Sequence, residues 1–214
     1  MKPKPISLEI NKVSKKAIYA GFWARCNAAT WDLLITYTIL TILYLAIGKY
    51  FKYSKNFYYF LYIFYFLYDY WLNIYLVQRY GGTPGKLITG IKILKLDGSK
   101  ITWKEATLRH LVHSSWVLFI TICPLISLAE VSNEYFNSLP YKAKLDYCDS
   151  CTKRTIYKAI FPYWFFIDVI MLLFNKRKRA LHDFIAGTVV VKTDYLETRK
   201  QRLRSEHFSC NYHE

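Results

Sequence analysis

Three aspartates lie inside strongly apolar stretches of this sequence: Asp32, Asp69 and Asp168. A charged side chain at bilayer depth is costly, so such residues need a partner, water or a neutral form. Arg25 precedes Asp32 by seven residues, which puts both on one face of a helix, about 10 Å apart along its axis. Because intramembrane carboxylates often mark ion pathways, these four residues are predicted to form a transport or ion-binding site.

The alternative is that the carboxylates only hold helices together. Polar contacts between membrane helices average under about 1 kcal/mol, so a structural Asp paired with Arg25 or Lys158 is equally compatible with the sequence. Asn73 follows Asp69 by one helical turn, and His113 enters the next apolar block near the same side. We interpret His113 as an interface residue.

Four apolar blocks must position these side chains. Each is about 20 residues long, the length with which a helix crosses a hydrocarbon core of about 30 Å. The blocks are Ala28–Gly48, Phe57–Val77, Leu111–Ala129 and Ile156–Phe174. Tyr, Trp and Phe make up 19% of the chain, which fits aromatic belts at the membrane surfaces. We therefore expect an all-α membrane protein with a bundle of four transmembrane helices.

Positive charge indicates the orientation of this bundle. Lys and Arg number 30 against 15 Asp and Glu, and they concentrate in residues 1–16, in 79–105 and in the run after Asn175. With four spans these segments share one side, which the positive-inside rule places in the cytoplasm. The expectation is a multi-pass cell-membrane protein, in the inner membrane if bacterial, with both termini cytoplasmic. A layout of three spans, with the last block lying on the surface, stays open.

This topology sets the expected domains and partners. Residues 1–18 form a basic cytoplasmic tail, 19–192 the membrane domain with an outer insertion at 131–155, and 193–214 a polar cytoplasmic tail. All three intramembrane carboxylates fall roughly 9 to 14 Å below the inner surface, which predicts one polar layer open to the cytoplasm. We expect anionic lipid headgroups as partners, a homo-oligomer because four helices enclose no wide path, and no nucleic acid, since topology explains the basic residues.

The loop at residues 80–86, YGGTPGK, resembles a phosphate-binding loop only in part. That loop needs Gly, four residues, Gly-Lys and then Ser or Thr, whereas Tyr80 and Leu87 occupy two of these fixed positions. The segment is better interpreted as a turn that redirects the chain at the membrane surface, with Lys86 facing lipid headgroups.

Two further local signals follow this loop. Asp97-Gly98 lies between β-prone runs and predicts a cytoplasmic β-hairpin, because a tight turn needs positive φ at its centre. The spacing of Thr102 and Glu105 predicts a capping box at the start of a helix that leads into the third span.

Cys148 and Cys151 fall in the outer insertion, where an oxidising compartment would allow a local disulfide. Unpaired thiols, redox chemistry and metal binding remain alternatives. A zinc site needs a second ligand pair at suitable spacing, and the insertion offers none. We expect no metal, no cofactor and no enzyme activity, because no nucleophile–base pair emerges.

Three motifs in order resemble the RDD family of polytopic membrane proteins, named for one Arg and two Asp. They are GFWARCNAATWDLLI, GGTPGKLITGIKILKLDGSKITWKEATLR and NKRKRALHDFIAGTVVVK. The resemblance assigns the Arg to Arg25 and the two Asp to Asp32 and Asp183. It implies a membrane domain suspected of transport, although the insertion at 131–155 departs from the compact family pattern.

The motif residues Gly82, Pro84, Gly85 and Lys86, together with Asp183, are expected to be structural. The run KRKRALHDFIAG is interpreted as a surface helix whose basic residues meet anionic lipid. Asp183 would cap this helix or tie it to the inner loop, and the run from Thr188 to Val191 would add a strand to the hairpin.

The sequence thus predicts a small transporter or ion-coupled carrier for a small cation or a proton. The alternative is a non-transporting scaffold or assembly factor that acts through its basic cytoplasmic face.

Overall fold

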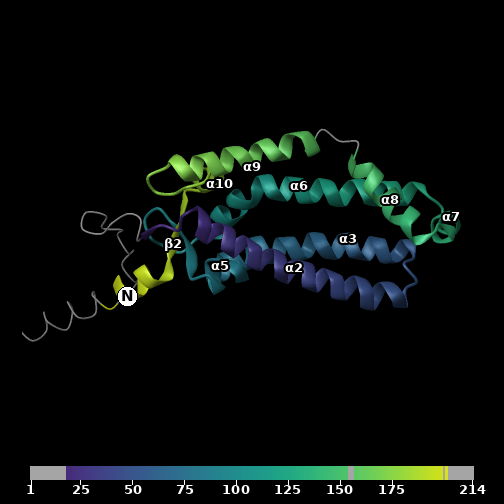
Figure 1. The fold of residues 1–214 in the computed structure, drawn as a ribbon, viewed down its shortest axis with the longest axis horizontal. Coiled ribbons are helices and arrows are strands. Elements are labelled where there is room, and N and C mark those ends of the chain that lie inside the picture. Colours follow the sequence, from purple (N-terminus) through teal and green to yellow (C-terminus); the bar gives the residue numbers. More distant parts are fainter. Residues whose placement is uncertain (1–17, 154–156, 200, 202–214) are drawn as a thin grey trace, which may run out of the picture.

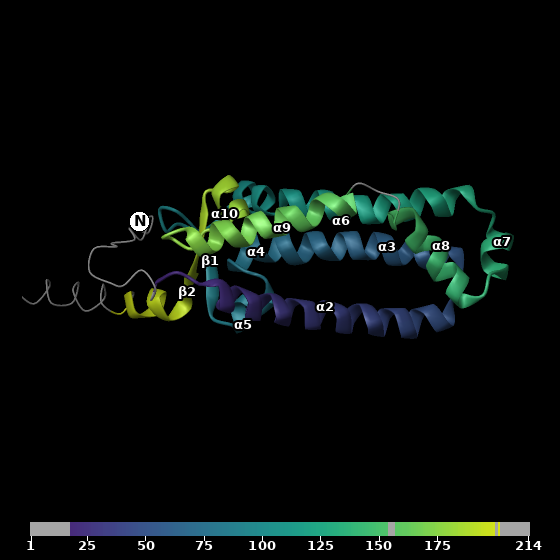
Figure 2. The ribbon, with the colours of Figure 1, turned by 45° about the horizontal axis from the view of Figure 1, so that its top comes forward.

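The computed structural model describes residues 18–153, 157–199 and 201, without the side chains of 149–161. Three helical runs are long and apolar enough to cross a membrane: α2 (Phe22–Tyr50), the continuous run Lys55–Tyr80 and α6 (Trp103–Glu130). They lie side by side along the long axis of the molecule (Figures 1 and 2). Three of the four expected apolar blocks therefore become helices of spanning length.

The run Lys55–Tyr80 is not one uniform α-helix. It consists of α3 (Lys55–Tyr70), a π-helical segment η1 (Trp71–Tyr75) and α4 (Leu76–Tyr80). A π-helical turn inserts extra backbone into the helical ladder and is frequently found at functional sites. Asp69 lies immediately before this segment and Asn73 inside it.

The fourth apolar block forms α9 (Tyr157–Phe174), in which Pro162–Phe174 is a shorter apolar helix. In both views α9 runs along the bundle beside α6, and its end lies near α10 (Leu181–Ile185) (Figures 1 and 2). The expected fourth span is thus present as a helix, but not with the length of the other three.

The expected outer insertion folds into two helices, α7 (Asn133–Ser138) and α8 (Tyr141–Lys153). α8 packs against α6, and Phe136 is fully buried beside Phe57 and Leu128. The Lys55 Nζ donates to the Val131 carbonyl at 2.5 Å, at the C-terminal end of α6. A cation is favourable there because helix carbonyls are unsatisfied at that end.

A two-stranded antiparallel sheet closes the opposite end of the bundle. β1 (Ile91–Lys95) pairs with β2 (Thr188–Lys192), with Ile93 opposite Val190. The predicted hairpin is therefore wrong in its second strand, although the Lys95–Ser99 turn forms. The expected strand from Thr188 to Val191 is confirmed, and it pairs directly with β1. The Thr102–Glu105 capping box is confirmed, and it starts α6 so soon after the turn that no residues remain for a returning strand.

The predicted surface helix is also corrected. The segment forms only the five-residue α10, and its Asp183 is fully buried. Arg179 is buried too, with its guanidinium 3.9 Å from the centre of the Phe184 ring. The basic run therefore folds partly inward, because the backbone carbonyls of Thr188 and Asp183 and the Phe184 ring offer Arg179 partners that a lipid surface does not.

The beginning and end of the described membrane domain meet at this same end. Tyr19 forms a β-bridge with Val191, directly before α2 begins. Figure 1 shows the sheet, α5 (Pro84–Ile88) and α10 gathered there, while α7 lies at the far end. The sheet, α5 and α10 therefore lie together at one end of the bundle, with α6 and α9 packed against α10.

Candidate functional site

Arg25 and Asp183, two of the three residues that the family resemblance singled out, are in direct contact. Arg25 Nη1 lies 2.6 Å from Asp183 Oδ2, and Arg25 Nη2 donates to the Lys178 carbonyl at 2.6 Å. Arg109 of α6 contacts the other Asp183 oxygen. We call Arg25, Arg109 and Asp183 the Arg–Asp anchor; it joins α2, α6 and α10. Arg25 and Asp32 therefore do not act as a pair.

Lys178 is placed to serve this anchor. Its φ is 49°, an uncommon left-handed conformation for a residue with a side chain. That conformation costs about 1 kcal/mol or more and is found where surrounding contacts over-determine it. The charge-assisted hydrogen bond from Arg25 to its carbonyl is such a contact.

The two arginines of the Arg–Asp anchor stabilise the ionised form of Asp183. Burial by itself would raise the pKa of this carboxyl, but Arg109 and Arg25 outweigh burial and hold the pKa well below its ordinary value of 3.8. Asp183 also accepts the Ala180 backbone N–H at 3.0 Å, which caps α10. A fixed carboxylate with this many partners is a structural element rather than a group that binds and releases an ion.

Asp168 of α9 belongs to the surroundings of the same anchor. It accepts a hydrogen bond from the His182 backbone and lies 2.9 Å from His182 Nδ1. His182 Nε2 is in turn 3.6 Å from Asp183 Oδ1. Burial and the nearby Arg109 lower the pKa of His182 below its ordinary value, although Asp168 opposes this shift. Asp168 thus fastens α9 to α10.

Asp32 holds the glycine-rich loop. It accepts the Thr83 hydroxyl at 2.5 Å and the Gly85 N–H at 2.7 Å. Gly85 lies so close to α2 that a Cβ there would be 2.2 Å from the Ala28 carbonyl oxygen. The loop is therefore a docking element whose glycine permits close contact with α2, and Pro84 starts its short helix.

Lys86 faces this carboxylate and not lipid headgroups, which corrects the sequence-based expectation. Its Nζ is 3.1 Å from Thr83 Oγ1 and 4.0 Å from Asp32 Oδ2. Burial and repulsion from Arg109 lower its pKa to about 8, even though Asp32 acts to raise it. The contacts explain why the loop looks like a phosphate loop: its lysine, the Thr83 hydroxyl and the Gly85 N–H surround an internal anion, the Asp32 carboxylate.

Asp69 has a different set of partners, all within the spanning runs. His110 Nε2 lies 2.9 Å from one carboxylate oxygen, and His113 Nε2 lies 3.5 Å from the other. Asn73 donates a hydrogen bond of 2.8 Å to Asp69 Oδ1, which is also the oxygen nearest to His113. We call Asp69, Asn73, His110 and His113 the Asp69 cluster. Asp69 and His110 are buried, whereas 45% of the His113 side chain is exposed.

The structure gives each of Asp32, Asp69 and Asp168 its own hydrogen-bond partners. None of these hydrogen bonds joins one of the three carboxylates to another. A common polar layer open to the cytoplasm stays a prediction. Of the four predicted transport residues, Asp69 alone has partners confined to the spanning runs among the described residues.

Sequence reasoning missed two members of these sites, His110 and Arg109. His110 and His113 are three residues apart in a helix, a spacing that places both side chains on one face. The sequence had placed His113 and Asn73 near Asp69, and the structure brings both into contact with it, but His110 was not singled out. Arg109 carried no local signal for its contact with Asp183.

The expected disulfide remains a prediction. Cys148 is buried in α8 beside Phe57 and Tyr58, and the side chain of Cys151 is among those that the structure does not describe.

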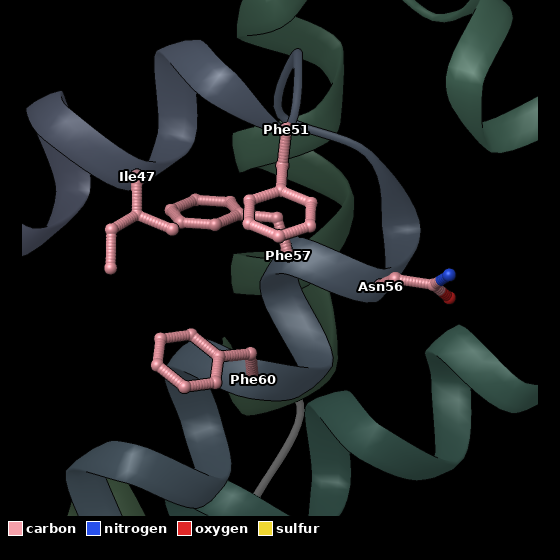
Figure 3. Close-up of a pocket in the computed structure, with 5 residues that line it drawn as sticks. All are labelled: Ile47, Phe51, Asn56, Phe57 and Phe60. Atoms are coloured by element: carbon pink, nitrogen blue, oxygen red, sulfur yellow. The ribbon is translucent and has the colours of Figure 1, made fainter.

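A pocket at the other end of the bundle has a different character. It lies where α2 turns into α3 and is lined by Ile47, Phe51, Asn56, Phe57 and Phe60. Figure 3 shows the Asn56 amide pointing away from the aromatic rings. The pocket therefore offers no polar group suited to an ion.

Long apolar helices around buried ionisable groups define a membrane-type protein. The comparison with family models agrees: the model of the RDD family matches residues 19–187, and the chain belongs to this family. It is also similar to Uncharacterized protein YckC of Bacillus subtilis (strain 168), with 28% identity over 172 residues. That match covers 80% of this chain and 83% of the relative.

Proposed function

We propose that this protein is a small carrier that binds a cation within the membrane and either moves it or couples to its movement. The observation that carries the proposal is the Asp69 cluster. A buried carboxylate lies between two imidazoles on helices of spanning length, 2.9 Å and 3.5 Å from their Nε2 atoms. Ionisable residues at such positions are expensive to bury and are characteristic of ion pathways.

The other charged residues support this assignment by their contacts. Asp183, Asp168 and Asp32 each hold a short helix or a loop through backbone N–H groups. Such bonds fix backbone, so an ion would have to compete with the fold for these oxygens. Asp69 accepts its bonds from side chains, which can rotate to admit an ion.

The proposal includes four membrane crossings with both termini in the cytoplasm. The meeting of Tyr19 with Val191 supports an even number of crossings, with α8 and α9 together returning the chain. Lys55 and Lys144, two lysines of the proposed outer side, are buried and contact the Val131 carbonyl and the Phe136 ring. Lysines with such internal contacts conflict less with the positive-inside rule than exposed ones do.

Association into homo-oligomers is part of the same proposal. α2 buries only 6% of its most apolar 18-residue window inside the chain. Its large exposed side chains include Trp31, Leu33, Leu34 and Tyr37. Lipid or a second copy must cover this face, and a path between copies would be wider than one inside a single chain.

A scaffold role remains the second candidate, since Lys176 and Arg177 are exposed at the sheet end of the molecule. Charge reversal at these two positions should abolish partner capture under that hypothesis and leave flux unchanged under the carrier proposal. The other two residues of the basic run are unsuitable for this test, because Lys178 and Arg179 have structural contacts.

Flux measurements in liposomes test the carrier proposal. Purified protein is reconstituted, gradients of Na⁺, K⁺ or Zn²⁺ are imposed, and cation entry is followed with trapped indicators. We expect cation-dependent flux in the parent and background flux in Asp69→Asn. Asp146→Asn is the matched control, because Asp146 is exposed on α8. Equal flux in the parent, Asp69→Asn and empty liposomes would refute the proposal.

A further inference from the structure

We infer that Asp69, His110 and His113 form a binding site for a divalent transition-metal ion of the Zn²⁺ class. This inference rests on the proposed function, because it names the cation that the Asp69 cluster takes. It is derived from the donor atoms, from their spacing and from the groups that surround them.

The spacing of the donors suits a metal ion. One carboxylate oxygen and two imidazole nitrogens, from Asp69, His110 and His113, lie within 4.8 Å of one another. Metal–ligand distances of 2.0–2.1 Å at tetrahedral angles place neighbouring ligand atoms about 3.3 Å apart. His110 Nε2 lies 2.9 Å from Asp69 Oδ2 and His113 Nε2 lies 3.5 Å from Asp69 Oδ1; these distances involve different carboxylate oxygens, and each is close to that value. Small side-chain rotations therefore suffice to admit an ion.

The donor types select the class of metal. Imidazole nitrogen suits Zn²⁺, Fe²⁺, Co²⁺ and Ni²⁺, whereas Mg²⁺ and Ca²⁺ prefer oxygen ligands throughout. Two neutral imidazoles and one carboxylate reduce the charge of a divalent ion to a single positive charge. This arrangement is less costly to place among apolar helices than either the bare ion or an unpaired carboxylate.

A neighbouring side chain orients the Asp69 carboxylate, as hydrogen-bond partners of the ligands do in known metal sites. Asn73 donates to Asp69 Oδ1 at 2.8 Å and so fixes the orientation of the carboxylate. Asn73 lies in the π-helical segment Trp71–Tyr75, one turn beyond Asp69. Such a helical irregularity re-aims side chains, and its position next to Asp69 supports a ligand-binding role.

The site also has a side for entry and exit. The Asp69 and His110 side chains are 10% and 11% exposed, against 45% for His113. Three protein ligands leave at least one coordination position open, as in sites that exchange a ligand. His113 is the most exposed of the three, so we place the open position on its side. An ion can therefore bind there and leave again, as a carrier requires.

The test is metal binding to full-length protein in detergent, measured apart from transport. Two of the chain's three other histidines, His207 and His213, lie near its end with Cys210, and Cys148 and Cys151 form a further pair of cysteines, so the parent for this test carries His207→Ala, His213→Ala, Cys210→Ser and Cys151→Ser. Chelator-treated protein without a histidine tag is titrated calorimetrically with Zn²⁺, and Co²⁺ absorption reports ligand geometry. We expect one ion per chain.

Substitution distinguishes the site from adventitious binding. His113→Gln should weaken Zn²⁺ binding at least 100-fold, and Asp69→Asn should abolish it, with unchanged size-exclusion profiles. His182→Gln is the matched control at a structural histidine and should bind as the parent does. No stoichiometric binding in the parent, or binding unaffected by His113→Gln and Asp69→Asn, overturns the inference.

The outcome is separable from that of the carrier proposal. Zn²⁺ binding without flux would keep the metal site and reject the carrier. Flux of Na⁺ or K⁺ without Zn²⁺ binding would keep the carrier and reject the metal site.

Discussion

Replacing Asp183 by Asn should cost the protein a large part of its stability. The Asp183 side chain is fully buried and contacts both Arg25 and Arg109. Removing one partner of a buried ion pair typically costs about 3–5 kcal/mol, because the remaining charge is left without compensation. Here two guanidinium groups lose their carboxylate, so we expect a value at the upper end of that range.

Thermal unfolding in detergent, followed by tryptophan fluorescence, measures this effect. For a chain of this size about 1 kcal/mol corresponds to roughly 2–4 °C, so Tm should fall by about 10 °C or more in Asp183→Asn. Asp194→Asn is the control, because Asp194 is exposed just after β2, and its Tm should match the parent. A Tm within about 1 °C of the parent in Asp183→Asn would refute the structural role of the Arg–Asp anchor.

Three further predictions follow from the same contacts. The folded-state pKa of Asp183 lies below its ordinary value of 3.8, so the stability that ionised Asp183 contributes is complete above pH 3.8 and is lost as the pH falls further. The difference in Tm between the parent and Asp183→Asn should therefore be constant from neutral pH to about pH 5 and shrink below pH 3.8. Gly85→Ala should destabilise by about 1–3 kcal/mol, since its Cβ would meet the Ala28 carbonyl; an unchanged Tm would show that the loop does not dock on α2. Glu105→Gln should lower stability by about 1 kcal/mol in the same assay through the weakened cap with Thr102, and a rise in Tm would contradict the capping assignment.

The long apolar elements were predictable because length and composition alone determine them. The spanning runs end within three residues of the expected blocks, whereas α2 begins six residues earlier than expected, at Phe22, and α6 eight residues earlier, at Trp103. The capping box at Thr102 predicted that early start, since capping is a local interaction. The family motifs were likewise recognisable as continuous sequence.

The partners of the charged residues were not predictable, because they depend on long-range contacts. Arg25 and Asp183 are separated by 158 positions, and no local pattern joins them. The hairpin prediction failed in part: the turn after β1 is local, but no strand returns from it, and the strand predicted from Thr188 to Val191 pairs with β1 instead. Asp69 was identified from burial cost and His113 from its position near the same side, but the contact with His110 depends on the packing of α3 against α6.

The most direct test of the account compares two conservative substitutions in one flux assay. Asp69→Asn and Asp32→Asn each remove one intramembrane carboxylate charge, and flux is expressed per correctly inserted, folded molecule. The account predicts background flux for Asp69→Asn and near-parental flux for the surviving folded fraction of Asp32→Asn, because Asp32 only holds the loop at Thr83 and Gly85. Parental flux in Asp69→Asn, or equal loss in both variants, would contradict it.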